Sequence, residues 1–230
     1  MQGFQGQGNE EQRNKPKIKP VHLLTVSDQK SQLVYSPNIK KRFNHIDLAI
    51  SCGDLPYHYI EYIQSSLDIP VYFVHGNHAS EVEYGSTTTR TAPWGAVNLH
   101  KKVTRDKKTG LLLAGIEGCL RYNEGKHQFT QAEMWVLVIS LLPKLLLNKI
   151  RFGRYLDIFV THAPSWGIHD QEDLCHQGVK AFKWLIRTFQ PAYHIHGHIH
   201  IYRPDTVRES TLGKTRIVNT YGYRTLILER

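Results

Sequence analysis

Short apolar runs rich in β-forming residues alternate with segments of helical spacing, and this alternation restricts the fold more than any other feature. The runs are bounded by turn residues and cover residues 21–26, 46–52, 71–76, 156–161 and 193–197. Residues 56–67 and 179–190 have helical apolar spacing, and Pro56 suits a helix start. Strand–helix–strand repetition predicts an α/β fold in which both faces of a sheet are covered. Two further segments indicate antiparallel hairpins, residues 101–116 and 206–228.

A single domain accounts for the length of the chain. The 230 residues are enough for one well-buried core, and no internal repeat is visible, so we expect one domain over residues 21–230. Residues 1–20 are rich in Gln, Gly, Asn and Lys and lack periodicity, which predicts a flexible tail. This tail has no apolar core, and we therefore expect no secretory signal.

The apolar segments and the cysteines bear on location. No run of about 18 apolar residues exists, so no membrane span is expected. The most apolar segment, residues 132–154, predicts a long helix packed on the sheet, with a basic membrane-surface helix as the alternative. Three scattered cysteines (Cys52, Cys119 and Cys175) fit neither a disulfide framework nor a Cys-rich zinc site. We therefore expect a reducing, cytoplasmic location.

The formal net charge of +9 is compatible with an anionic partner, such as a nucleotide, a nucleic acid or a membrane surface. It is equally compatible with a surface that is merely basic. The cations are dispersed and lack the aromatic interleaving that single-strand binders use. Charge alone therefore supports a nucleic-acid partner only weakly.

Polar side chains follow five of the predicted strands directly. Because functional sites in open α/β sheets gather beyond the carboxyl ends of strands, these positions matter most. Taken singly, a Gly-Asp turn is usually only a turn, but five ends in the same topological place predict a metal site. The residues concerned are Asp28, Asp54, Asn77 with His78, His162, and His198 with His200.

These donors also indicate the chemistry. Asp, Asn and His together suit Zn, Mn, Fe or a similar divalent ion rather than a thiolate site. The donors outnumber the needs of one tetrahedral ion, whereas two ions bridged by one carboxylate would use them all. Such a pair generates a hydroxide at neutral pH and neutralises charge on phosphoryl oxygens. The pattern therefore predicts cleavage of phosphate esters.

The ordered motifs "SD", "GD", "GNH", "TH" and "GHIH" resemble those of the calcineurin-like metallophosphoesterase superfamily, over nearly all of residues 21–230. The resemblance implies an α/β fold with a four-layer α/β/β/α sandwich of two mixed sheets. It also implies a metal-dependent phosphoesterase that acts through a metal-bound hydroxide. Diester, nucleotide-type and pyrophosphate substrates are all compatible with the motifs, because the ions contact only the phosphate.

Residue by residue, the resemblance assigns roles to the strand ends. His78 is not a ligand in this assignment, but stabilises or protonates the leaving oxygen. The implied metal ligands are Asp28 and His200 for the first ion, Asn77, His162 and His198 for the second ion, and Asp54 for both.

The residues around these ligands carry further expectations. Gly53, Gly76 and Gly197 are expected to let the backbone turn sharply at each strand end. His194 and His196 fall within a strand and are expected to be ordinary packed histidines. Support of the ligands by hydrogen bonding is the alternative for them.

Lys30 departs from the superfamily pattern, which usually has a histidine at this place. A protonated ammonium cannot donate a lone pair to a metal ion. Three outcomes follow: another group completes the first site, one ion is held firmly beside the Lys30 ammonium, or catalysis is impaired and the protein is an interaction scaffold. We expect a working enzyme, because the other motif residues, including His78, are present.

Substrate contacts are expected from Lys30, Arg121 and His176. Arg121 follows a predicted strand, and a guanidinium suits forked phosphate contacts, although a surface arginine is the commoner case. His176 lies in the loop 163–178, and comparable loops in this superfamily lie over the metals. A small-molecule phosphoester is the expected partner and a nucleic acid the less favoured one. The sequence does not determine the oligomeric state.

Overall fold

The computed structural model describes residues 19–78, 83–84 and 89–229. Of the predicted flexible tail, residues 1–18 lie outside the described part of the chain. The helices are α1 (Ile39–Phe43), α2 (Tyr57–Leu67), α3 (Gln131–Ile139), α4 (Leu142–Phe152) and α5 (Lys180–Phe189). The strands are β1 (Val21–Ser27), β2 (Leu48–Ser51), β3 (Val71–Phe73), β4 (Glu83–Tyr84), β5 (Thr89–Arg90), β6 (Val97–Asn98), β7 (Lys102–Arg105), β8 (Leu112–Ile116), β9 (Cys119–Leu120), β10 (Gln128–Phe129), β11 (Ile158–Thr161), β12 (Tyr193–His196), β13 (Glu209–Leu212), β14 (Thr215–Asn219) and β15 (Gly222–Leu228).

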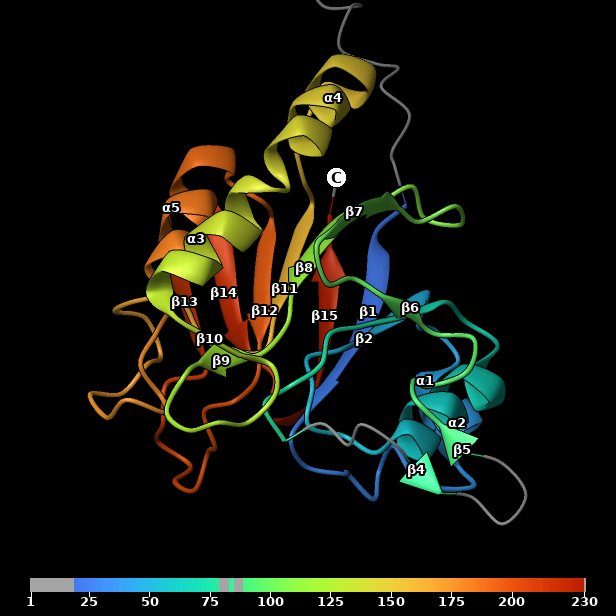
Figure 1. The fold of residues 1–230 in the computed structure, drawn as a ribbon. Coiled ribbons are helices and arrows are strands. Elements are labelled where there is room, and N and C mark those ends of the chain that lie inside the picture. Colours follow the sequence, from blue (N-terminus) through green and yellow to red (C-terminus); the bar gives the residue numbers. More distant parts are fainter. Residues whose placement is uncertain (1–18, 79–82, 85–88, 230) are drawn as a thin grey trace, which may run out of the picture.

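Two mixed sheets form the centre of the molecule (Figure 1). The first has the strand order β15-β1-β2-β3-β6, and the second has the order β13-β14-β12-β11-β8-β7. Helices α1 and α2 pack on the first sheet, while α3 and α5 pack on the second. The predicted four-layer α/β/β/α sandwich is therefore confirmed.

The apolar strand residues are buried on both faces, which explains why the strands are continuous apolar runs. Leu23 and Ile50 lie between the two sheets, whereas their neighbours Leu24 and Ala49 face α1 and α2. In the second sheet Ile158 also lies between the sheets. Successive side chains of a strand point to opposite faces, so each strand contributes to two layers of core.

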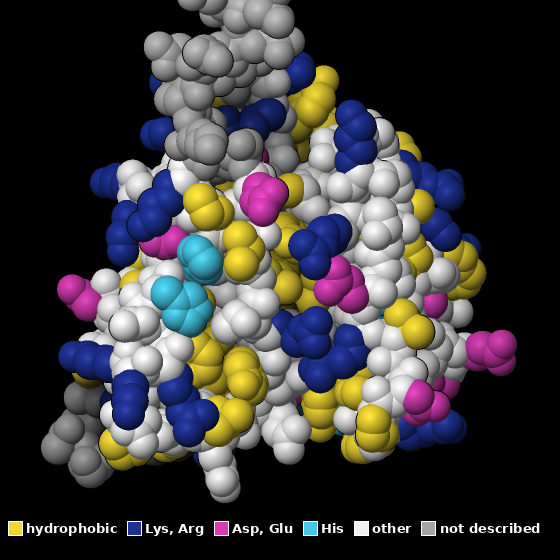
Figure 2. All heavy atoms as spheres, turned by 180° about the vertical axis from the view of Figure 1, so that it is seen from behind, with side chains coloured by type: hydrophobic (Ala, Val, Ile, Leu, Met, Phe, Trp, Pro, Cys, Tyr) yellow, Lys and Arg dark blue, Asp and Glu magenta, His cyan; other side chains and the backbone are white. Residues whose placement is uncertain are grey.

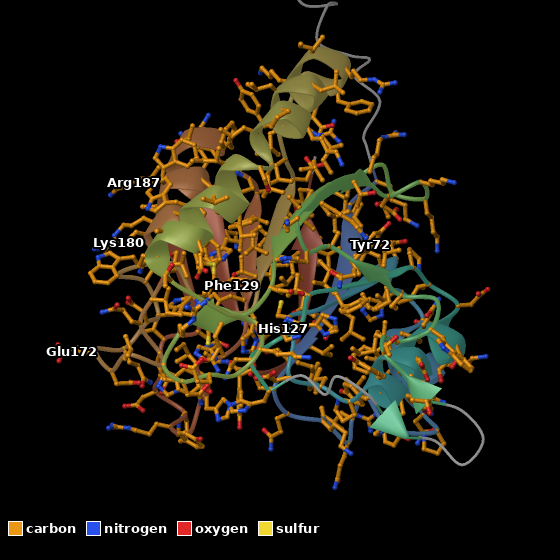
Figure 3. All side chains as sticks on the ribbon, in the orientation of Figure 1. Tyr72, His127, Phe129, Glu172, Lys180 and Arg187 are labelled. Carbon is orange, nitrogen blue, oxygen red and sulfur yellow. The ribbon has the colours of Figure 1, made fainter. Side chains whose placement is uncertain are left out.

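The predicted hairpins and helices are largely confirmed. Strands β7 and β8 pair antiparallel, as do β13 and β14. Strand β15 leaves the second hairpin and pairs antiparallel with β1 in the other sheet, from Val21 opposite Leu228 to Ser27 opposite Gly222. In α5, Lys180 and Arg187 point away from the sheet (Figure 3), as the apolar spacing predicts.

The prediction of one long buried helix over residues 132–154 is wrong. The segment divides at Ser140–Leu141 into α3 and α4, and a proline lies in the first turn of α4. Helix α4 buries only Leu145 and exposes Leu146, Leu147 and Ile150, so it is not packed on a sheet along its length. No helix among the described residues is long and apolar enough to cross a bilayer.

Parallel pairing explains where the polar strand ends meet. Strands β1, β2 and β3 run parallel to one another, and so do β8, β11 and β12. Within each sheet the carboxyl ends therefore lie at one edge. The hydrogen bond between His162 and the Cys52 carbonyl shows that the two edges meet. On the face seen in Figure 2, Lys and Arg side chains are interspersed with acidic and apolar ones and form no continuous basic stripe.

Candidate metal centre

Side chains from three other strand ends converge on the imidazole of His162, which is fully buried. Its Nε2 atom lies 2.9 Å from Oδ1 of Asn77 and 3.2 Å from Oδ2 of Asp54. Nδ1 of His198 lies 3.1 Å from the same Nε2 atom. These residues follow β2, β3, β11 and β12 in the chain. Two nitrogens and two oxygens therefore face one another, as the ligands of a single divalent ion do.

Two backbone carbonyls orient the imidazoles of this cluster. Nδ1 of His162 donates to the carbonyl oxygen of Cys52 at 2.7 Å, and Nε2 of His198 donates to the carbonyl oxygen of Cys175 at 2.8 Å. In each ring the other nitrogen is the one that faces the cluster. A metal-ligating histidine typically uses its second nitrogen in this way, so the donor set fits a metal ion.

The same cluster has strongly perturbed acid–base properties. Burial alone would lower the pKa of His162, but the carboxylates of Asp54 and Asp28 outweigh it and raise that pKa to about 9. Burial would raise the pKa of Asp54, yet His162 and the hydrogen bonds to Asp54 lower it to about 2. Burial and the neighbouring His162 lower the pKa of His198 to about 3. At neutral pH the cluster therefore holds an anionic carboxylate and a neutral His198.

Asp28 and His200 form a looser group beside this cluster. One ligand atom each from Asp28, Asp54 and His162 lies within 4.8 Å of the others. Asp28 accepts hydrogen bonds from the Ser27 hydroxyl and from the backbone N–H of His198. Nε2 of His200 lies 3.9 Å from Oδ1 of Asp28, and the His200 side chain is 44% exposed. In this half of the centre the Asp28 side chain is only 1% exposed, so His200 is the ligand that is open to solvent.

Three ligand positions have strained backbone conformations. Asp28, Asp54 and His198 have φ values of 61°, 55° and 67°, in the left-handed region. This conformation costs roughly 1–2 kcal/mol for a residue with a Cβ atom. Strain of this kind persists where the surrounding structure imposes it, most often at functional sites.

The expectation for the glycines is right only for Gly53, which has a φ of 100°. Gly76 and Gly197 do not adopt the left-handed conformation, and the residues that do are Asp54 and His198. Both positions need glycine because a side chain would not fit there. A Cβ atom at Gly76 would collide with the Asp54 carboxylate, and one at Gly197 would lie 2.6 Å from Oδ2 of Asp28.

His78 and Lys30 are both exposed, and each closely follows a ligand position in the chain. The backbone N–H of His78 donates to Oδ1 of Asp54 at 2.9 Å, which places this residue directly beside the carboxylate that the superfamily resemblance assigns to both ions. Lys30 lines a depression of about 520 Å³ together with Arg208 and Tyr221. Neither side chain belongs to the convergent ligand cluster.

The other two residues expected to contact substrate have protein partners. Nη2 of Arg121 lies 3.1 Å from Oε2 of Glu133, whose carboxylate also completes the capping box of α3 with Thr130. Nδ1 of His176 lies 2.9 Å from Oδ1 of Asp173, and its ring centroid is 5.2 Å from that of His198. The structure thus brings His176 to the centre and directs Arg121 towards α3.

His194 and His196 are buried within β12, as predicted. Nε2 of His194 lies 2.8 Å from the hydroxyl of Thr161, and Nε2 of His196 lies 3.0 Å from Nδ1 of His169. Burial lowers the pKa of His194 to about 3. These rings are neutral packing groups behind the ligands.

Sequence reasoning missed two groups at the centre. Nδ2 of Asn77 donates to the Tyr122 hydroxyl at 2.9 Å, and this hydroxyl also makes a hydrogen bond with the Cys175 thiol. Tyr122 follows Arg121 in the same predicted strand end, so that segment does reach the centre, but through a different side chain. No local pattern marks Cys175, because its place depends on the course of the loop 163–178.

A sequence profile described as "Calcineurin-like phosphoesterase" matches residues 34–202, which is most of the chain. The chain belongs to the calcineurin-like phosphoesterase family. The match includes Asp54, Asn77, His162 and both histidines of "GHIH", but it begins after Asp28. The part of the centre that departs from the superfamily pattern thus lies outside the matched segment.

Solved structures of low sequence identity share the fold. One crystal structure has a TM-score of 0.59 and 15% identity, and the alignment covers 91% of this chain and 95% of the other. TT1561 of Thermus thermophilus has a TM-score of 0.57 and 16% identity, with 88% and 90% of the two chains covered. No curated protein matches the sequence.

Proposed function

We propose that this family member hydrolyses phosphate esters with the help of divalent metal ions. The observation that carries the proposal is the convergence of Asp54, Asn77 and His198 on Nε2 of His162, at 2.9–3.2 Å. Buried polar atoms that face one another in this way need a common partner, and a divalent cation satisfies all four.

Two ions are proposed, held as the superfamily resemblance implies. The nitrogen and oxygen donors suit Mn, Fe or Zn. Asp54, Asn77, His162 and His198 would hold the second ion, and Asp28, Asp54 and His200 the first. When bound, such ions activate water and neutralise the charge that develops on phosphoryl oxygens.

Side chains of the protein would carry out proton transfer and hold the ligands in place. His78 is exposed and has its backbone fixed on Asp54, so its imidazole can reach a substrate oxygen from the solvent side. We assign it proton donation to the leaving oxygen. Asp28 and Asp54 keep the ligand geometry through their hydrogen bonds to the backbone of His198 and His78.

Several polar groups suit a phosphoester substrate. Lys30 and Arg208 line one depression and would attract its negative charge, and His176 lies beside His198 on another side. Arg121 could contact a phosphate only after it releases Glu133. A small-molecule diester, nucleotide-type or pyrophosphate substrate is proposed ahead of a nucleic acid, since Lys and Arg are dispersed on the surface.

The cysteines support a proposal about location. All three are free thiols in the structure. Unpaired cysteines persist in reducing compartments, and they support the proposal of a cytoplasmic location.

A catalytically impaired interaction scaffold is the second candidate. Lys30 favours it, because an ammonium replaces a nitrogen ligand at the first ion and this residue lies before the family match. In a scaffold the second ion would hold the fold together and no turnover would be needed.

Hydrolysis of an aryl phosphodiester in the presence of Mn²⁺ separates the two candidates. The phosphoesterase proposal expects turnover that Asp54→Asn lowers by at least about 1000-fold, equivalent to about 4 kcal/mol in the barrier. His78→Ala should lower turnover by about 100-fold or more while leaving metal content unchanged. Metal-replete protein that turns over no aryl phosphoester would favour the scaffold.

A further inference from the structure

A second group of metal-capable side chains borders the proposed centre. One ligand atom each from Cys175, His176 and His198 lies within 4.8 Å of the others. Cys175 and His176 belong to the loop after β11, and His198 follows β12. Cys175 is half-buried, while the His176 side chain is 35% exposed, so an ion can reach this group from solvent.

His176 is oriented as a metal ligand. Its Nδ1 atom lies 2.9 Å and 3.0 Å from the two carboxylate oxygens of Asp173, which can only accept a hydrogen bond from it. In the neutral ring, Nε2 of His176 is therefore the nitrogen that carries the lone pair. A carboxylate behind the imidazole fixes the ring and strengthens nitrogen donation to a metal.

The thiol gives this group a different metal preference from the oxygen-rich centre. A thiolate with two imidazoles is a soft donor set, which selects Zn²⁺ over Mn²⁺. Zinc forms its bond with the sulfur anion, and the thiol proton leaves to solvent as the bond forms. Cys52 and Cys119 are buried in the core, so Cys175 is the cysteine available for such a bond.

His198 connects the two groups. Its Nδ1 faces His162 at 3.1 Å, whereas its Nε2 lies against the carbonyl oxygen of Cys175 at 2.8 Å. In the proposed centre, His198 gives one nitrogen to the second ion. An ion held by Cys175 and His176 would need the lone pair of Nε2 of His198, so the ring proton would move from Nε2 to Nδ1. A protonated Nδ1 could no longer ligate the second ion.

We propose that Cys175, His176 and His198 form a thiolate-containing zinc site, and that filling it withdraws His198 from the proposed catalytic ion. Excess zinc then inhibits the enzyme through Cys175. The inhibition rests on the proposed function, whereas zinc binding itself does not and can be tested without turnover.

Cobalt(II) titration tests the binding. The wild-type protein should develop the near-ultraviolet charge-transfer absorption of a cobalt–thiolate bond, and Cys175→Ser should lose it. Cys52 and Cys119 remain in that variant and serve as the internal control. Absence of the band in the wild type, or its persistence in Cys175→Ser, overturns the site whether or not the protein is a phosphoesterase.

Zinc inhibition of Mn²⁺-loaded protein tests the consequence. Cys175→Ser keeps the backbone carbonyl that orients His198, and its inhibition by zinc is measured relative to its own activity without zinc. It should need at least about tenfold more zinc for half-inhibition, and Asp173→Asn should shift the value in the same direction by less. Equal zinc sensitivity of the wild type and Cys175→Ser overturns the inhibitory role.

Discussion

The two halves of the proposed metal centre differ in how completely the protein prepares them. Around His162, donor atoms of three other side chains lie 2.9–3.2 Å from the buried Nε2, and backbone carbonyls fix both imidazoles. Around Asp28, the imidazole of His200 is 3.9 Å away on a side chain that is 44% exposed. Lys30 supplies an ammonium where the superfamily usually supplies a nitrogen ligand.

This difference indicates an order of loading. A preorganised ligand set loses little side-chain freedom when it binds, and its donors are already removed from water. The half at His200 must order an exposed imidazole, and Lys30, two residues after Asp28, adds a positive charge that repels an incoming ion. We therefore expect one tightly held ion at His162 and one exchangeable ion at Asp28.

Substitution of the ligands should have the largest effect on the difference in metal affinity between the two halves. Asn77→Ala removes a donor from the prepared half and should weaken the tighter ion by at least about 100-fold. His200→Ala should leave the tighter ion in place and lower only the occupancy of the exchangeable ion at Asp28. Metal content after dialysis, measured by elemental analysis, distinguishes the two variants, and equal loss of metal in both would contradict the ordering.

The affinity of the tighter ion should depend on pH because of His162. The pKa of His162 is raised to about 9 from an ordinary 6.5, so the proton on this ring stabilises the apo-protein below pH 6.5 and that stabilisation is lost as pH rises through about 9. A metal must displace this proton. Affinity of the tighter ion should therefore rise about tenfold per pH unit between about pH 7 and the pKa of His162.

Calorimetry in buffers of different ionisation enthalpy measures the released proton directly. About one proton per tighter ion should be released near pH 7, and none well above the pKa of His162. Asp54, whose pKa is about 2, contributes nothing in this range. A pH-independent affinity would show that His162 does not lie in the ligand set.

Restoring the usual ligand at Lys30 should have the smallest of these effects. Lys30→His supplies a neutral nitrogen and removes an ammonium, so the weaker ion should bind about tenfold more tightly. Lys30→Gln removes the charge without supplying that nitrogen and serves as the matched control. Isothermal titration with Mn²⁺ measures both, and equal gains in the two variants would refute coordination as the cause.

Prediction from sequence succeeded where the pattern reflects local geometry. Short apolar runs rich in β-forming residues predicted the main strands, and Pro56 marked the start of α2 correctly. It failed for residues 132–154, because apolar content alone does not show whether a sheet lies beneath a helix. Leu146 and Ile150 have no sheet to pack against, and only the assembled fold reveals this.

Residue types and their order along the chain established which donors exist and which strand end carries each of them. The departure from the superfamily pattern at Lys30 is also visible in the sequence, because a protonated ammonium has no lone pair to give to a metal ion. The tertiary structure decided which atoms face one another. The Cys52 and Cys175 carbonyls select the ligand nitrogens of His162 and His198 across 110 and 23 residues of sequence. The first pairing depends on how the two sheets meet, and the second on the course of the loop after β11.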